Sequence, residues 1–165
     1  MQNRVDGFKS VIDTYDGIEI VAEQIANSDR AEAVTVMETI LQANPDIDGV
    51  WAANDEMALG AVEALRALGL EKEVIVGGFD ATVDAVSAVQ IGEMNFTANQ
   101  IPYEIGARAI AISYMQAKGM ELPSEDIQLE MSMIDGENVQ QYIDEQVQQQ
   151  KDTINQVLEE YGLNQ

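Results

Sequence analysis

The chain has 165 residues, 46% of them hydrophobic, and its 30 acidic and 8 basic side chains give a net charge of −22. Such a surface would repel a phosphate backbone or an anionic membrane face, so we expect neither as a partner. Cysteine and histidine are absent, which excludes disulfides, thiolate and Ser-His-Asp chemistry, and the usual zinc ligand sets. We therefore expect a protein that is not an enzyme and that carries no cofactor and no metal.

The length suits one ordinary domain, and no apolar run approaches the roughly 20 residues needed to cross a bilayer. The chain starts with the polar stretch MQNRVDGF, which lacks the charged end and apolar core of a signal peptide. We expect that a signal peptide has been removed or that the chain is a fragment.

Helical and strand-like hydrophobic patterns alternate along the chain. In chain order they predict helix 4–15, strand 18–23, helix 29–43, strand 50–54, helix 55–68, strand 73–80, helix 82–91, strand 95–100, helix 102–118, strand 126–134 and helix 137–161. Asp29 suits an N-cap, Gly69 a C-terminal cap, and Pro102 the first turn of a helix. This alternation is typical of an α/β fold with an open parallel sheet and helices on both faces.

Three successive predicted strands end in a polar side chain: Asn54, Asp80 and Gln100. Right-handed crossovers bring the carboxyl ends of parallel strands to one edge of the sheet, where ligands bind in open α/β folds. Each of the three residues could instead merely cap a helix or close a turn. Because they occupy corresponding positions on three strands, we favour a shared binding site.

Carboxylates, amides and guanidinium groups together are well suited to bind sugar hydroxyls. A carboxylate accepts hydrogen bonds from two adjacent hydroxyls, and an amide both donates and accepts. Arg4 would add a fork of donors that stay charged, if the start of its helix lies near the same edge. We expect a monosaccharide ligand at this edge.

Four stretches, RVDGF, ILQANPDIDGVWAANDEMALGAVEAL, VIVGGFD and ANQIPYEIGARAI, resemble the second half of ribose-type periplasmic sugar-binding proteins. The resemblance covers residues 4 to about 142. It implies a pentose or hexose enclosed between two lobes and delivered to the permease of an ABC transporter. It also implies a periplasmic or extracellular, lipoprotein-type location for the family. Matched motif by motif, Arg4, Asn54, Asp80 and Gln100 fall on the family's sugar-contact positions.

The chain departs from the family pattern at Ser28, where ribose-type proteins usually carry an aromatic ring that stacks on the sugar. Ser28 could donate a further hydrogen bond instead, or a neighbouring ring could take over the stacking. Phe79 and Trp51 are the nearest aromatic residues in the sequence, and both are more typical of a core position.

A second departure concerns the first lobe and the first strand of the second lobe, which have no counterpart here. The resemblance thus predicts a sheet that is incomplete at its N-terminal end and three segments: a sugar-binding portion 1–100, a crossover helix and strand 101–136, and a helical tail 137–165. The exposed strand edges would be an aggregation liability. We expect a partner to fill the gap, either a second copy in a homodimer or the missing N-terminal half.

Two other functions compete with this interpretation. The effector domain of lac-repressor-type regulators shares the fold, and the tail helix could support self-association. An enzyme using Asp55 and Glu56 as a carboxylate pair is the third possibility, although neighbouring helix residues point in different directions.

Overall fold

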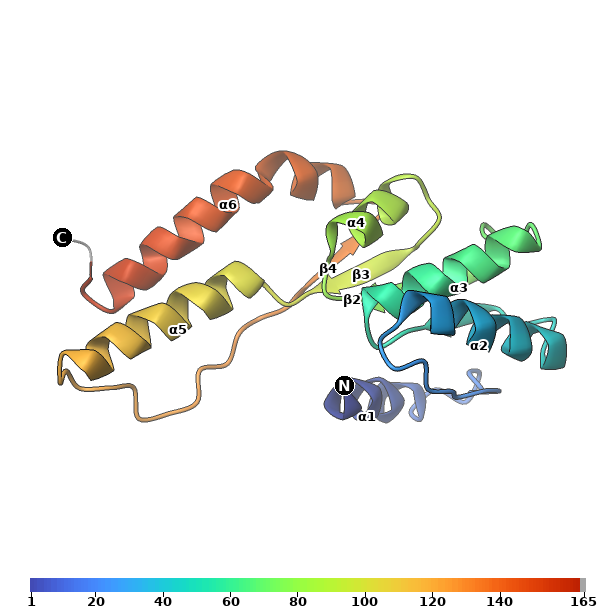
Figure 1. Ribbon diagram of the computed structural model, residues 1–165, viewed down its shortest axis with the longest axis horizontal. Coiled ribbons are helices and arrows are strands. Elements are labelled where there is room, and N and C mark those ends of the chain that lie inside the picture. The colour runs from blue at the N-terminus through green and yellow to red at the C-terminus, as the bar shows by residue number, and fades with distance from the viewer. Residues whose placement is uncertain (164–165) are drawn as a thin grey trace. The chain divides into compact units, whose positions relative to one another are not determined.

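A computed structural model describes residues 1–163, which divide into two compact units. The first unit comprises residues 1–99 and 133–139, and the second contains residues 100–132 and the chain from 140 onward. The helices are α1 (Gln2–Ile12), α2 (Arg30–Ala43), α3 (Asp55–Ala67), α4 (Val83–Gln90), α5 (Pro102–Ala117) and α6 (Val139–Glu160) (Figure 1). The strands are β1 (Gly49–Trp51), β2 (Ile75–Phe79), β3 (Phe96–Asn99) and β4 (Ser132–Asp135).

The sheet of the first unit has the strand order β1-β2-β3-β4. β1 pairs parallel with β2, with Trp51 opposite Gly77, and β2 pairs parallel with β3, with Gly77 opposite Phe96. The predicted α/β fold with an open sheet is therefore confirmed. The carboxyl ends of β1, β2 and β3 lie at one edge, as the sequence pattern required.

The two faces of the sheet have different chemistry, because residues that are opposite each other in a parallel pair point to the same side. Val76, Gly78 and Thr97 form a buried face that packs against α3. A Cβ on Gly78 would lie only 2.8 Å from Met94 Cε and 3.2 Å from Ala58 Cβ. The small residue thus allows α3 to approach the middle of the sheet.

The opposite face is aromatic and carries Trp51, Phe79 and Phe96, all half-buried. The Phe96 ring lies against Gly77, where an added Cβ would fall 2.7 Å from Phe96 Cε1. Helix α1 covers part of this face, since the Phe8 ring stacks on Trp51 with centroids 4.4 Å apart and an interplanar angle of 3°. Helices therefore lie on both faces of the sheet.

Helices α2 and α3 run side by side in close contact (Figure 1). Gly60 of α3 makes this approach possible, because a Cβ there would lie 2.7 Å from Ala33 Cβ and 3.2 Å from the Val34 nitrogen. Ala33, Met37 and Leu41 of α2 are buried by the pairing. The predicted N-cap Asp29 is confirmed, since its carboxylate accepts the Glu32 N–H at 2.8 Å.

The predicted strand over residues 18–23 was wrong. These residues have no secondary-structure assignment, and Ile18, Val21 and Ile25 are 52%, 52% and 78% exposed. A strand needs a hydrogen-bonded neighbour, and within residues 1–163 no other strand takes up this segment. The strand predicted at 126–134 is shorter than expected and begins later in the chain: only Ser132–Asp135 joins the sheet.

In the second unit, Arg108 connects the helices α5 and α6. Its guanidinium bonds Glu104 on its own helix at 2.9 Å and Glu160 of α6 at 2.9 Å. The hydrogen bonds with Glu160 raise the pKa of Arg108, so the group stays fully charged. The predicted tail helix is confirmed, whereas its role in self-association remains a prediction. Within residues 1–163, none of the helices combines the length and apolarity needed to cross a membrane.

We predict that Gly60→Ala lowers the free energy of unfolding by about 1–3 kcal/mol, the usual cost of overpacking. The added methyl would force α2 and α3 apart. Urea unfolding followed by circular dichroism measures the change.

Gly7→Ala in α1 is the matched control, because nothing lies within 4 Å of a Cβ at that position. It should leave stability unchanged or raise it by up to about 1 kcal/mol, since alanine is the better helix former. Equal stability of Gly60→Ala and the parent would contradict the tight helix pairing.

Candidate functional site

Arg4 lies in the first turn of α1 and reaches the carboxyl edge of the sheet. Its Nη1 donates to the carbonyl of Ala53, just beyond β1, at 2.8 Å. Its Nη2 donates to Asp80 Oδ1, just beyond β2, at 2.9 Å. The guanidinium also lies 3.8 Å above the centroid of the Phe79 ring, which is a cation–π contact. One side chain thus joins the ends of two strands, and the condition set for Arg4 in the sequence analysis is met.

The carboxylate of Asp80 is held in a strained stretch of backbone. Asp80 and Ala81 have φ of 123° and 55°, a backbone region that residues other than glycine seldom adopt. Each such residue costs on the order of 1–3 kcal/mol, and the surrounding structure must hold it there. The Asp80 N–H donates to the Ala98 carbonyl at 2.9 Å, which extends the β2–β3 pairing into the turn.

Asp55, the first residue of α3, supports this turn through hydrogen bonds on the buried side of the sheet. It is completely buried, and its carboxylate accepts the Thr82 N–H at 2.7 Å and the Thr97 hydroxyl at 2.7 Å. The Thr97 oxygen in turn accepts the Ala81 N–H at 3.1 Å. Burial raises the pKa of Asp55, although both hydrogen bonds favour the charged form. Because the Asp55 carboxylate is buried and hydrogen-bonded, Asp55 cannot serve as one half of an exposed catalytic pair with Glu56.

Asn54 caps α3. Its side-chain oxygen accepts the Met57 N–H at 3.0 Å, so the capping role considered in the sequence analysis is real. The cap uses only the oxygen of the amide and not its two N–H donors. The cap therefore does not exclude a second role in which the amide donates to a ligand.

Ser28 and Gln100 contribute differently. Ser28 is exposed and lies with Asn27 in a turn of positive φ, 62° and 47°, immediately before the N-cap of α2. Gln100 follows the last residue of β3 and belongs to the second unit. The structure brings Arg4 and Asp80 into direct contact. All five predicted ligand contacts, including those of Arg4 and Asp80, stay predictions.

The aromatic residues near this edge are not core residues, contrary to the sequence analysis. Trp51 and Phe79 are both half-buried, Trp51 under Phe8 and Phe79 under the Arg4 guanidinium. The spacing of Arg4 and Phe8, one helical turn apart, could have indicated that both point to the same surface. Rings are thus present beside the predicted site even though Ser28 offers none.

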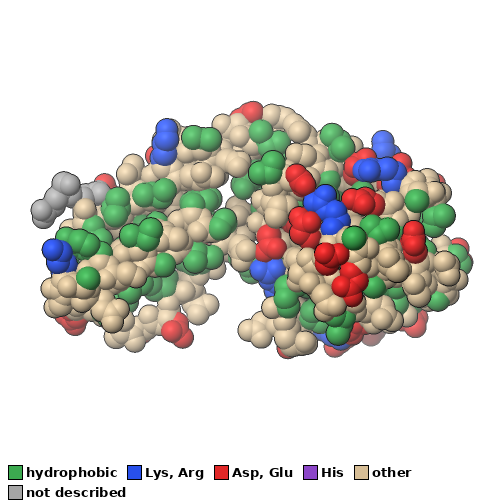
Figure 2. Space-filling model, in the orientation of Figure 1, with side chains coloured by type: hydrophobic (Ala, Val, Ile, Leu, Met, Phe, Trp, Pro, Cys, Tyr) green, Lys and Arg blue, Asp and Glu red, His purple; other side chains and the backbone are tan. Residues whose placement is uncertain are grey.

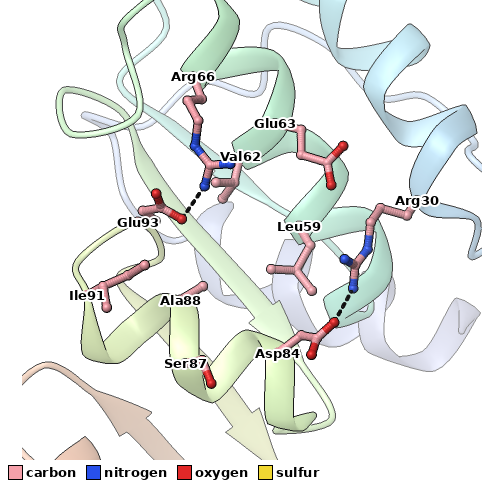
Figure 3. A pocket seen from close by; sticks show the side chains of 10 residues that line it. All are labelled: Arg30, Leu59, Val62, Glu63, Arg66, Asp84, Ser87, Ala88, Ile91 and Glu93. Atoms are coloured by element: carbon pink, nitrogen blue, oxygen red, sulfur yellow. Dashed lines mark hydrogen bonds and ion pairs between the residues drawn. The ribbon is translucent and has the colours of Figure 1, made fainter.

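A separate hollow lies between α3 and α4 and is lined by Leu59, Val62 and two ion pairs (Figure 3). Arg30 bonds Asp84 at 3.0 Å there, and Arg66 pairs with Glu93. Arg30 also makes two bonds with Glu56, which raise its pKa. Both arginines that line this hollow are already neutralised by carboxylates, so neither offers an unpaired positive charge to a ligand.

On the face of the first unit that Figure 2 shows, acidic side chains outnumber basic ones, as they do in the sequence, which has 30 acidic and 8 basic residues. Among residues 1–163, no group of three or more acidic side chains is arranged to hold a metal ion. The Arg4–Asp80 pair is half-buried, with 22% and 25% of the two side chains exposed. A paired charge at a partly open strand edge is the chemistry expected for a neutral polar ligand.

Comparison with known proteins identifies the family to which this chain belongs. A family model described as a periplasmic binding protein domain matches residues 1–121. The chain belongs to the periplasmic binding protein family. Among curated relatives, the ribose import binding protein of Salmonella typhimurium is 36% identical over 124 residues, 75% of this chain and 41% of the relative. The D-apiose import binding protein of Actinobacillus succinogenes is 44% identical over 109 residues, 65% of this chain and 34% of the relative.

Solved structures of the family agree with this assignment. A periplasmic solute-binding protein of an ABC transporter from Actinobacillus succinogenes, with bound D-allose, superimposes with a TM-score of 0.82 at 37% identity, covering 86% of this chain and 50% of that one. A Mycobacterium smegmatis protein in complex with β-D-fucofuranose gives a TM-score of 0.84 at 27% identity. The chain spans half or less of the length of these relatives. The family is one of binding proteins, in agreement with the prediction that the chain is not an enzyme.

We predict that Arg4→Ala releases α1 from this periplasmic-binding-protein sheet. The helix has no buried residue of its own and is attached through Arg4 and the Phe8–Trp51 stack. Loss of the two partly buried charge-assisted bonds should cost about 1–3 kcal/mol. Trp51 should become more accessible, and acrylamide quenching of its fluorescence measures this.

Lys9→Ala is the control on the same helix, since Lys9 pairs with Glu23 at the exposed surface. It should leave the quenching of Trp51 unchanged, because exposed ion pairs contribute little. Unchanged quenching in Arg4→Ala would show that Arg4 does not anchor the helix.

Proposed function

We propose that the first unit binds a monosaccharide at the carboxyl edge of β1 and β2, as the sugar-binding part of an ABC-transporter substrate-binding protein. The observation that carries this proposal is the Arg4–Asp80 pair, bonded at 2.9 Å and partly exposed beside the Phe79 ring. A carboxylate fixed by an arginine accepts hydrogen bonds from adjacent hydroxyls in a defined direction. A ring beside it can take the apolar C–H face of a sugar.

The other predicted residues complete a set of contacts for a polyhydroxylated ring. In this proposal the amide N–H groups of Asn54 donate to a hydroxyl while its oxygen remains in the helix cap. Ser28 supplies a hydroxyl. The relatives named for ribose and D-apiose import, and the solved structures with D-allose and β-D-fucofuranose, support a pentose or hexose as the ligand.

The setting follows from the same relatives. We infer that the protein acts in the periplasm or at the outer cell surface and delivers its sugar to a membrane permease. The resemblance implies that a second lobe normally supplies half of the contacts. Contacts from this unit alone should give a dissociation constant on the order of 1 mM, or about −4 kcal/mol.

We predict that titration with D-ribose, D-allose or D-apiose gives a saturable change in Trp51 fluorescence. Trp51 is the only tryptophan and lies on β1, three residues before Asn54. Asp80→Ala should abolish the change, because the hydroxyls lose their main acceptor. Fluorescence titration at constant ionic strength gives the affinity of each sugar.

Asp84→Ala is the matched control, since it removes an acidic residue whose partner is Arg30 in the hollow between α3 and α4. It should bind the same sugar as the parent. Equal binding by Asp80→Ala and the parent would refute the proposed site, and silence of the parent toward all three sugars would count against a self-sufficient sugar site.

We further propose that the outer edge of β1 pairs with a strand from a partner, either a second copy or the other half of a whole binding protein. Among the described residues β1 has a hydrogen-bonded neighbour on one side only. The exposed apolar segment 18–25 supports the proposal, since such a segment is normally covered.

Amide hydrogen exchange at two adjacent residues tests this pairing. The Ala52 N–H donates inward to the Gly77 carbonyl at 2.9 Å, so the alternating strand geometry turns the Trp51 N–H outward. We predict that Ala52 exchanges slowly at every concentration, whereas Trp51 becomes protected only as sedimentation velocity shows a dimer, or when the other half is added. A strict monomer with a protected Trp51 amide would contradict the proposal.

A further inference from the structure

The turn that presents Asp80 is unusual because it places two consecutive non-glycine residues at positive φ. Asp80 and Ala81 have φ of 123° and 55°. Glycine is the residue that normally occupies such positions at little cost. An alanine at the second position means that the fold imposes the turn rather than the local sequence.

Three side-chain hydrogen bonds hold this turn from the buried face of the sheet. The Ala81 N–H donates to the Thr97 hydroxyl oxygen at 3.1 Å, and the Thr82 N–H donates to Asp55 Oδ2 at 2.7 Å. The Thr97 hydroxyl donates to Asp55 Oδ1 at 2.7 Å, which closes the network. Asp55 and Thr97 are each 0% exposed, so water cannot replace these bonds.

The network is separated from the ligand edge and yet acts on it. Thr97 lies on the α3 side of the sheet and bonds Asp55, the first residue of α3, whereas the carboxylate of Asp80 faces Arg4 and the aromatic side. The network bonds the N–H groups of Ala81 and Thr82, which directly follow Asp80 in the chain. Any relaxation of Ala81 toward negative φ would therefore rotate the peptide that follows Asp80 and move its carboxylate relative to Arg4.

We propose that Asp55 and Thr97 are positioning residues that hold the Asp80–Ala81 turn at positive φ and so aim the Asp80 carboxylate at the ligand. This inference rests on the proposed function for the statement that Asp80 receives a sugar. The positioning itself is a property of the ligand-free chain and can be measured without one. A purely structural role would stabilise the unit but would leave the direction of Asp80 unchanged.

Thr97→Val is the decisive variant, because it keeps the shape of the side chain and removes the hydroxyl. In the full chain, amide exchange and HN–Hα coupling constants by NMR report the bonds and the φ angles of Asp80 and Ala81 directly. We expect the Ala81 N–H, which loses its acceptor, to exchange at least about tenfold faster. The couplings should shift away from their positive-φ values, and affinity for D-ribose and D-allose should fall about tenfold.

Two further variants separate positioning from stability. Thr97→Ser restores the hydroxyl and should restore the protection of Ala81. Ala81→Gly placed in Thr97→Val removes the steric cost of positive φ, so it should recover most of the lost affinity. Val62→Ala, a buried truncation elsewhere in α3, should lower stability without changing the exchange of Ala81 or the affinity.

The outcomes that would overturn the proposal are specific. Unchanged exchange and couplings in Thr97→Val would do so, as would an equal loss of affinity in Val62→Ala. If Thr97→Val does not fold, Asp55→Asn takes its place. Asp55 accepts the Thr82 N–H at Oδ2 and the Thr97 hydroxyl at Oδ1, and asparagine replaces one of these two acceptor oxygens with an NH2 donor. Unchanged exchange at both Ala81 and Thr82 in that variant would overturn the proposal.

The same set distinguishes failure of this inference from failure of the proposed function. A parent chain that binds neither D-ribose nor D-allose counts against the function alone, while the exchange and coupling data still decide whether Asp55 and Thr97 fix the turn. A Thr97→Val variant whose turn has relaxed but which binds sugar as tightly as the parent refutes the positioning role alone.

Discussion

The carboxylate of Asp55 is buried at the N-terminus of α3, where three parts of the first unit meet. Burying a charge without partners is costly, and here the cost is offset by the Thr82 amide, the Thr97 hydroxyl and the positive end of the α3 dipole. Each partner comes from a different element: the turn after β2, strand β3 and the helix itself. The geometry of the ligand edge depends on this one group, because it fixes where the backbone leaves β2.

Small residues make that arrangement possible. Gly78 leaves space on the α3 side for the Asp55 carboxylate and for Ala58, while Gly77 leaves space on the other side for the Phe96 ring. Two adjacent glycines in the middle of a strand lose conformational entropy on folding and contribute no packing of their own. Their effect is to bring a charged helix end and an aromatic layer close to the same strand. The sheet therefore has one face built around a hydrogen-bond network and another built from rings.

What could be predicted from the sequence was mainly local. The N-caps Asp29 and Asn54 follow from short-range signals, and the parallel pairing follows from the alternation of strands and helices; the structure has both. The sequence could not show whether the helix of Arg4 starts near the edge that carries Asp80, because the two residues are 76 positions apart. Their contact could therefore be predicted only on the condition that it does. The role of Asp55 was not recognised, because its partner Thr97 lies 42 residues away and nothing local marks a threonine as a support. The segment 18–23 has a strand-like hydrophobic pattern but forms no strand. A strand also needs a hydrogen-bonded neighbouring strand, and the hydrophobic pattern of a segment does not show whether one is present.

The charge balance at the edge limits the ligand more strongly than any single contact. Arg4 is the cation there, and it is already paired with Asp80, so an anionic ligand would face a neutralised arginine on a chain of net charge −22. A phosphate or carboxylate ligand would have to displace Asp80 and would still meet the repulsion of the surrounding acidic surface. A neutral polyol meets neither obstacle, because its hydroxyls can accept from the guanidinium and donate to the carboxylate while the ion pair stays intact. If the proposed site is correct, the same pairing lets an acidic protein keep an arginine at this edge without selecting acids.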